Sequence, residues 1–224
     1  SHSEYDKEQK EYPVTCAADK YFPSLTDEQR RRFCMLPGLY GEWNGKVNVI
    51  SRKDITNFEA NHLLHSLAIA RFITFAPGTK VIDVGTGGGL PGIPLAIMFP
   101  DVQFILIDSI AKKIMVVRDI TATLGLGNVT AVTARSESFR GQYDFIVSRA
   151  VTEMSSFISL THHLLSPRSF NTVHNGYLFL KGGDLADELK PFSSAATVMD
   201  IKGWYDEPYF ETKKLIYLPG KGKK

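Results

Sequence analysis

A glycine run directly after a short apolar stretch is the segment whose residue types and spacing are best suited to chemistry. The run is Val81–Gly92, with the sequence VIDVGTGGGLPG. It predicts a buried strand that ends near an acidic residue and leads into a loop whose backbone comes close to a ligand. Glycine suits such a loop because a Cβ would block the approach and because the turn visits positive φ. A dinucleotide and S-adenosylmethionine both fit loops of this kind.

The spacing of the glycines separates these two cofactors. Residues Gly87–Gly92 fit the dinucleotide pattern G-x-G-x-x-G, but that frame starts late after the strand and puts Pro91 where a phosphate-binding helix should begin donating amides. The frame D-x-G-x-G-x-G, from Asp83 to Gly89, is that of S-adenosylmethionine-dependent methyltransferases. A carboxylate such as Asp83 also suits a cofactor that carries an ammonium and a sulfonium. We therefore favour a methyltransferase over an NAD-dependent oxidoreductase.

Acidic residues also follow the next two expected strands. Asp108 ends the apolar run Gln103–Ile107, where a carboxylate can grip the two hydroxyls of a ribose. Asp is also a favoured helix N-cap, and we favour the ribose role over that alternative. Ser136 and Glu137 follow the third strand, where an adenine ring is usually met. Glu137 fits equally well as a charge in the first turn of a helix.

Basic residues end the fourth and fifth expected strands. No Asp/Asn-Pro-Pro-aromatic motif of exocyclic-amine methylation follows the fourth strand, and neither Cys16 nor Cys34 lies at a strand end to act as a nucleophile. Arg149 remains, and its planar fork matches the O6 and N7 acceptors of guanine. We predict a catalytic role for Arg149 over a structural ion pair, with Lys181 as a second basic group beside the same cleft.

The elements that must position these residues alternate between strand and helix from Lys80 onward. Strands are expected at residues 80–84, 103–107, 129–133, 145–148 and 177–180, and helices at 91–98, 111–124, 153–165 and 184–189. Such alternation predicts an α/β fold with a parallel sheet that binds ligands at the carboxyl ends of its strands. Two strand-like segments at 195–202 and 210–218 have no helix between them, which predicts a final antiparallel pair.

We divide the chain into three parts: residues 1–25, poorly ordered; residues 26–78, an N-terminal helical extension; and residues 79–224, the cofactor-binding domain. Residues Thr26–Gln29 form a capping box, which predicts a helix from about Thr26 to Leu36 that ends before Pro37. A loop around residues 43–50 and a second helix near 58–75 follow.

Composition excludes several classes of protein. The 224 residues are 43% hydrophobic and 22% charged, as in ordinary globular proteins, and no apolar run approaches the ~20 residues of a membrane span. The two cysteines lack metal-binding spacing, and His62 and His65 lack a matching carboxylate or Cys. We therefore expect that the protein binds no metal and that His62 and His65 are packed in the interior or face the substrate. We also expect a cytoplasmic monomer with reduced thiols.

A net charge of +2 does not by itself indicate a nucleic-acid partner. Five basic residues outside the expected sheet could nevertheless form a face that positions RNA phosphates, namely Arg30, Arg31, Arg32, Lys46 and Arg52. The alternative is a helix face that only meets solvent.

Taken together, these motifs resemble the glucose-inhibited division protein B family, which methylates guanine N7 in bacterial small-subunit (16S) ribosomal RNA. The resemblance spans roughly residues 26–218 and is carried by Trp43-Asn44, His62-x-x-His65-Ser66, Asp83–Gly92, Asp108-Ser109, Arg135–Glu137, Ser148–Ala150 and Leu180–Gly182. The sequence departs from the family at His65, where the family has Asp, and at Ser136, where Ala is common.

The resemblance implies a Rossmann-like class I methyltransferase with a seven-stranded sheet. It implies S-adenosylmethionine as cofactor, with Gly85, Leu90, Ser136, Glu137 and Arg149 around it, and small-subunit RNA or an assembling subunit as partner. Guanine N7 carries a lone pair and no proton, so the reaction needs no general base, which agrees with the absence of an evident acid-base pair. Methylation of another RNA base or a small molecule, and non-catalytic cofactor binding, are the alternatives.

Overall fold

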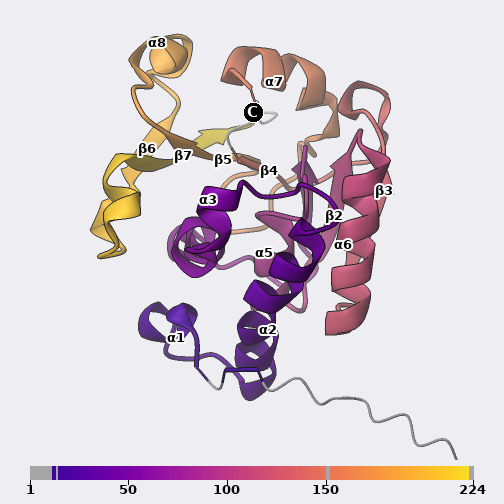
Figure 1. Ribbon diagram of the computed structural model, residues 1–224. Helices are drawn as coiled ribbons and strands as arrows, with labels where there is room; N and C mark the ends of the chain where they lie inside the picture. Colours follow the sequence, from indigo (N-terminus) through magenta and orange to yellow (C-terminus); the bar gives the residue numbers. More distant parts are fainter. Residues whose placement is uncertain (1–11, 14, 150–151, 222–224) are drawn as a thin grey trace, which may run out of the picture.

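The structure contains one seven-stranded sheet with the strand order β3-β2-β1-β4-β5-β7-β6 (Figure 1). It is a computed structural model that describes residues 12–13, 15–149 and 152–221. The strands are β1 (Lys80–Val84), β2 (Gln103–Asp108), β3 (Val129–Thr133), β4 (Phe145–Arg149), β5 (Gly176–Gly182), β6 (Thr197–Asp200) and β7 (Lys213–Pro219). Strands β1 to β5 are parallel, and β7 runs antiparallel to β5 and β6. The predicted parallel sheet with an antiparallel C-terminal pair is confirmed.

The chain changes direction across the sheet between β1 and β4. From β1 it moves outward to β2 and β3, and then it returns to place β4 on the other side of β1. In open parallel sheets this switch point leaves a crevice at the carboxyl ends of the strands, where ligands bind. The glycine loop and Asp108 lie at this edge because they follow or end β1 and β2.

Helices cover both faces of the sheet, with α7 and α8 on the side opposite to α2, α3 and α5 (Figure 1). The helices are α1 (Ala17–Tyr21), α2 (Asp27–Asn44), α3 (Arg52–Ile55), α4 (His65–Phe72), α5 (Gly92–Met98), α6 (Ala111–Leu124), α7 (Met154–Thr161) and α8 (Ala186–Leu189). Shorter 3-10 turns lie at Ser136–Ser138, His162–Leu164, Lys190–Phe192, Ile201–Gly203 and Pro208–Thr212. No described helix is both long enough and apolar enough to cross a membrane.

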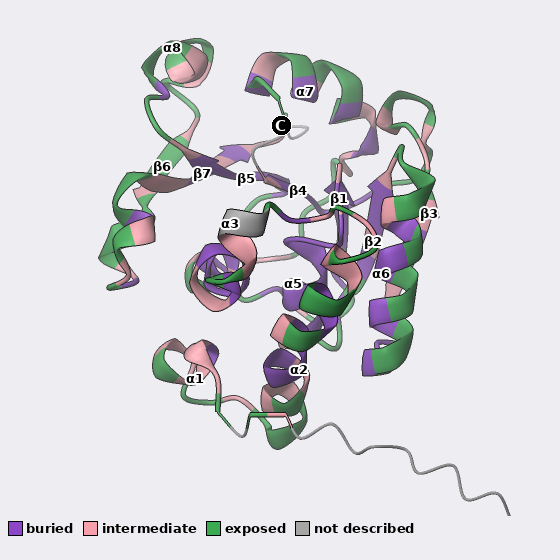
Figure 2. Ribbon diagram, in the orientation of Figure 1, coloured by how far each residue is buried: buried purple, intermediate pink, exposed green. Residues whose placement is uncertain are grey.

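The central strands are largely buried (Figure 2), and their side chains alternate between two buried cores. Val81 and Phe145 belong to the core shared with α2, α4, α5 and α6, whereas Ile82 and Ile146 belong to the core shared with α7. Successive residues of a strand point to opposite faces. The position of a functional residue along its strand therefore decides which set of helices it meets.

Helix α2 is longer than the sequence predicted. Its capping box forms as expected: the amide of Gln29 donates to Thr26 Oγ1 at 3.1 Å, and the amide of Thr26 donates to Gln29 Oε1 at 2.9 Å. The expected end before Pro37 is wrong, because α2 continues through it. Proline removes one helical hydrogen bond, but Leu39 and Tyr40 beyond it are buried in the core, which holds the last turns in place.

The second N-terminal helix begins as a π-helix, η1 (Glu59–Leu64), and continues as α4. The N-terminal helices share one hydrophobic core with the sheet. Of the segment expected to be poorly ordered, residues 1–11 and 14 lie outside the described part, and α1 lies within it. The division of the chain at residue 79 stays a prediction.

Candidate active site

A cavity of about 480 Å³ lies at the carboxyl ends of β1, β2 and β3. It brings together five of the residues predicted at the cofactor: Gly85, Gly87, Asp108, Ser136 and Glu137. It is not lined by the other four, which are Asp83, Gly89, Leu90 and Arg149. Lining residues that the sequence did not single out include Lys113, Phe157 and Leu160. The three-residue spacing of Phe157 and Leu160 on α7 was the one available signal for this wall of the cavity.

The glycine loop is held from two sides. Gly85 and Gly87 have φ values of 72° and 60°, which few residues other than glycine adopt. The amide of Gly87 donates to Asp108 Oδ2 at 2.9 Å, which ties the loop to the end of β2. On the other side, Tyr40 Oη on α2 donates to the carbonyl oxygen of Gly88 at 2.7 Å. The loop therefore has a fixed shape before any ligand binds.

Asp108 uses both carboxylate oxygens to organise the backbone around the cavity. Oδ2 accepts from Gly87, and Oδ1 accepts from the amide of Ile110 at 2.9 Å. The N-cap of α6 is Ile110, so Asp108 does not take the N-cap role that was the alternative to ribose binding. It forms an Asx-type turn just before the helix. Each oxygen has two lone pairs, so the carboxylate can still accept hydroxyl groups from a ligand.

Asp83 lies behind the glycine loop and not in the cavity, where we had expected it to face a cationic cofactor. Its side chain is fully buried, and Oδ2 accepts from Thr86 Oγ1 at 2.7 Å and from the amide of Gly92 at 2.9 Å. Burial raises the pKa of this carboxyl to about 7, against the lowering effect of the two hydrogen bonds. Asp83 thus stabilises the glycine loop from its buried side by accepting these two hydrogen bonds. Leu90 is also buried, next to this loop.

Arg149, at the end of β4, points toward the N-terminal helices. Its register partner on β5 is Leu180, which belongs to the core on that face. Arg149 Nη1 lies 2.8 Å from Nδ1 of His62 and 3.5 Å from the carbonyl oxygen of Asn61. Burial lowers the pKa of the guanidinium, and the nearby Tyr209 and Asp83 oppose that shift. The described residues therefore place Arg149 beside the glycine loop on the side of α2 and η1.

Lys181 does not share a cleft with Arg149, contrary to the sequence prediction. It follows Leu180 on β5 and so faces the side of α7 and α8, where Nζ donates at 2.6 Å to both Glu188 Oε1 and the carbonyl oxygen of Thr152. These residues line a second cavity of about 520 Å³, together with Glu153, Gly182, Asp184, Leu185 and Asp187. Thr152 lines both cavities, so the two are adjacent at the same edge of the sheet.

The histidines of the N-terminal helices are buried and uncharged. Burial, and then the charge of Arg149, lowers the pKa of His62 to about 3, and the same causes lower the pKa of His65 well below its usual value. The ring of His65 packs edge-on against Tyr209 at 5.7 Å between centroids. Among the described residues, no group of three His, Cys, Asp or Glu side chains could hold a metal ion.

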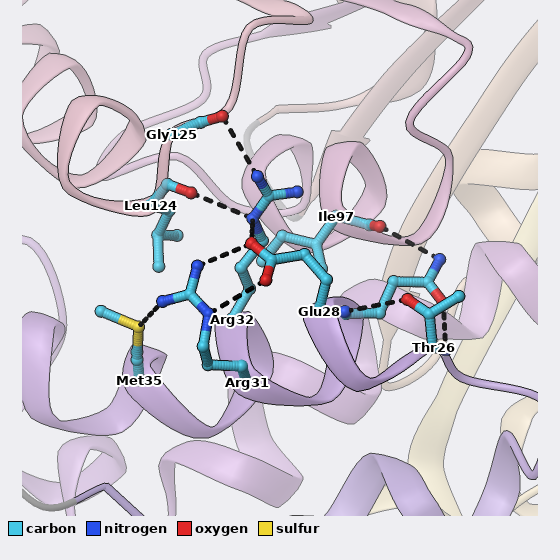
Figure 3. Close-up of polar contacts among 9 residues, drawn as sticks. Thr26, Glu28, Arg31, Arg32, Met35, Ile97, Leu124 and Gly125 are labelled. Carbon is cyan, nitrogen blue, oxygen red and sulfur yellow. Dashed lines mark hydrogen bonds and ion pairs between the residues drawn. The ribbon is translucent and has the colours of Figure 1, made fainter.

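The arginine run of α2 makes contacts within the protein, which Figure 3 shows for Arg31 and Arg32. Arg30 pairs with Asp19 and Asp27, and Arg31 pairs with Glu28. Arg32 donates to the carbonyl oxygens of Leu124 and Gly125 at 3.0 and 3.2 Å, which fastens α2 to the end of α6. These guanidinium groups make hydrogen bonds and ion pairs within the protein, so the run is not a helix face that only meets solvent, and phosphate binding by it stays a prediction.

The two remaining basic candidates lie after this run. Lys46 Nζ lies 5.3 Å from the ring centroid of Trp43, a cation–π contact at the end of α2. Arg52 begins α3, and its side chain lies outside what the structure describes. Phosphate binding by these two residues stays a prediction.

Comparison with known proteins identifies close relatives. A family model described as GidB, rRNA small subunit methyltransferase G, matches residues 36–204. The ribosomal RNA small subunit methyltransferase G of Flavobacterium johnsoniae is 53% identical over 204 residues, which cover 91% of this chain and 97% of that relative. The protein of the same name from Bacteroides thetaiotaomicron is 50% identical over 198 residues, or 88% of this chain and 96% of that one.

Two solved methyltransferase structures have a similar fold. A SAM-dependent methyltransferase from Aquifex aeolicus has a TM-score of 0.53 at 14% identity, over 75% of this chain and 98% of that one. Ribosomal protein L11 methylase from Lactobacillus delbrueckii subsp. bulgaricus has a TM-score of 0.52 at 16% identity, over 70% and 76% of the two chains. At these identities the likeness concerns the fold, which is the predicted class I methyltransferase fold.

Proposed function

Because the chain belongs to the rRNA small subunit methyltransferase G family, we propose that it transfers a methyl group from S-adenosylmethionine to N7 of a guanine in small-subunit (16S) ribosomal RNA. The observation that carries this proposal is the cavity at the β1–β3 edge, with a glycine loop on one side and the carboxylate of Asp108 beneath it. The partner is the RNA of the small subunit, naked or in an assembling particle, and we expect a cytoplasmic monomer.

The residues around the cavity fit this cofactor. A Cβ added to Gly87 would meet no atom within 4 Å, so the loop leaves open space beside its backbone. Asp108 would accept the ribose hydroxyls, and Ser136 and Glu137 would border the adenine. When bound, S-adenosylmethionine supplies an electrophilic methyl group on its sulfonium. Arg149, a cation next to the glycine loop, would face an anionic group of the bound molecules.

The reaction requires the protein to position the two reactants but not to transfer a proton. Guanine N7 attacks with a lone pair and loses no proton, so rate enhancement comes from alignment and from tolerance of a purine that becomes cationic. Neither Cys16 nor Cys34 lines the cavity, which fits a reaction without a protein nucleophile. Lys181 and the carboxylates of the second cavity lie next to the cofactor cavity, with Thr152 lining both, and this supports assigning Lys181 to the substrate side of the reaction.

Methylation of purified small subunits tests the proposal. Subunits that lack the modification should gain a methyl group from labelled S-adenosylmethionine, and chemical cleavage at 7-methylguanine should map it. Methylation at another base, or of no RNA, would refute the guanine-N7 assignment. Cofactor binding without turnover on either naked RNA or subunits would identify a non-catalytic binding module.

A glycine pair gives a matched control for the cofactor site. Gly87→Val puts a β-branched residue at a positive φ and should weaken S-adenosylmethionine binding at least about tenfold in titration calorimetry. Gly127→Val is the control, because Gly127 is exposed, has no positive φ and has no atom within 4 Å of an added Cβ. Equal cofactor affinity in the two variants would contradict the placement of the cofactor at this loop.

A further inference from the structure

Arg149 is a half-buried cation that forms no ion pair with any carboxylate of the described residues. Its polar partners are the neutral ring of His62 and the carbonyl oxygen of Asn61. A buried charge is costly unless another charge or a set of hydrogen bonds compensates it. An anionic group on a bound molecule would supply that compensation. The two neutral acceptors, Nδ1 of His62 and the carbonyl oxygen of Asn61, orient the guanidinium group.

The contact with His62 fixes the tautomer of that ring. A guanidinium nitrogen carries donors only, so Nδ1 of His62 must accept, and the single ring proton must lie on Nε2. A protonated His62 would bring a second donor and a second positive charge against Arg149. The depressed pKa of His62 agrees with a neutral ring. The buried Nε2 has no hydrogen-bond partner among the described residues, so the hydrogen bond of the imidazole is the one that Nδ1 accepts from Arg149.

The backbone and packing around His62 hold the ring in place. His62 and Asn61 both lie in the π-helix η1, a rare form that often marks functional sites. Asn61 Nδ2 donates to Asp54 Oδ1 at 3.1 Å, which anchors this turn to α3. Phe58 packs 5.6 Å from the ring of His62 and is itself stacked on Tyr40 at 5.0 Å. Tyr40 also holds the glycine loop, so one packed group connects the loop with Arg149.

We infer that His62 is a positioning residue: its neutral imidazole accepts from Arg149 and aims the remaining guanidinium donors at an anionic group of a bound molecule. The inference rests on the proposed function, because that function supplies the bound molecule that Arg149 would contact. The anion is a carboxylate or a phosphate, so the source is either the methionine part of the cofactor or the RNA backbone. A guanidinium donates to both groups in the same bidentate way.

Three substitutions and a coupling measurement test this role. His62→Asn keeps an acceptor near the position of Nδ1, whereas His62→Leu keeps the bulk and loses the acceptor. His162→Leu, at an exposed histidine, is the control. His62→Leu should weaken cofactor affinity or single-turnover methylation at least tenfold, and His62→Asn should recover most of the loss at a similar Tm. In an Arg149→Ala background, His62→Leu should cause no further loss, because residues that act through one another are not additive.

Nitrogen-15 NMR of the wild-type histidines gives a readout that does not need activity. We expect Nδ1 of His62 to be unprotonated and Nε2 protonated from pH 5 to 8. A proton on Nδ1, or an equal loss from His62→Leu with and without Arg149, would overturn the inference. A drop in calorimetric affinity for S-adenosylmethionine would assign the anion to the cofactor, and a drop in RNA affinity alone would assign it to a phosphate. If Arg149→Ala keeps full activity and full affinity for S-adenosylmethionine and RNA, the inference is overturned while the proposed function stands, because methyl transfer then does not depend on Arg149.

Discussion

Replacing Asp83 by asparagine should remove a pH dependence of stability that the wild-type protein shows between pH 5 and 8. Asp83 is fully buried, with hydrogen bonds to one oxygen and no partner for the other among the described residues. Its pKa is about 7 in the folded protein, against an ordinary value of 3.8. Between these values the folded state holds a proton that the unfolded chain has released. The free energy of unfolding therefore falls as the pH rises through this window.

The size of the effect follows from the shift in pKa. A shift of roughly three units corresponds to about 4 kcal/mol over the whole window, of which about 2–3 kcal/mol falls between pH 5 and 8. For a domain of this size, that is roughly 5–10 °C in Tm. Asparagine keeps an acceptor for Thr86 and Gly92 and does not titrate. Asp83→Asn should thus be as stable as the wild type or more stable at pH 8.

Thermal melting of three proteins at pH 5 to 8 checks this reasoning. Asp101→Asn, at an exposed carboxyl, should follow the wild-type pH profile, whereas Asp83→Asn should lack the decline. Cofactor affinity at pH 7.5 should survive Asp83→Asn, because this side chain does not line the cavity. The same pH slope in the wild type and Asp83→Asn would refute the raised pKa. Loss of cofactor binding in Asp83→Asn would refute its assignment to the loop interior.

Three other substitutions have defined outcomes. Asp108→Ala should weaken S-adenosylmethionine binding at least about tenfold in calorimetry, because it removes the ribose acceptor and the bond to Gly87; unchanged affinity would contradict the ribose role. Lys181→Met should lower the free energy of unfolding in urea by about 3 kcal/mol, because it leaves the half-buried Glu188 carboxylate without its cation, and adding Glu188→Met should restore part of the loss. No recovery in the double variant would contradict this account of the pair. Arg32→Ala should cost about 1–3 kcal/mol in the same assay and leave the salt dependence of RNA binding unchanged; a flatter salt dependence would support the phosphate-binding hypothesis.

The strands and the cofactor edge were predictable because their signals are local. The range predicted for β1 agrees with the structure, and so does the range predicted for α6. The end of α2 was not predictable in this way, since the burial of residues beyond Pro37 depends on the sheet they pack against. The sequence predicted a helix at η1 but not its π-helical form, because the apolar spacing of Leu63 and Leu67 indicates only that the segment is helical.

The side to which each candidate side chain points depends on strand register, which one sequence does not contain. Arg149 and Lys181 each end an apolar strand, and that shared position suggested a shared cleft. In the sheet, Arg149 pairs with Leu180, so Lys181 is one residue further along and faces the opposite layer of helices. A shift of one residue would have placed both cations together. The register thus separates the two cations at one edge: Arg149 contacts His62 in η1, and Lys181 contacts Glu188 beside α7 and α8. The sequence alone identified both residues as functional candidates, and the register determines which layer of helices each one meets.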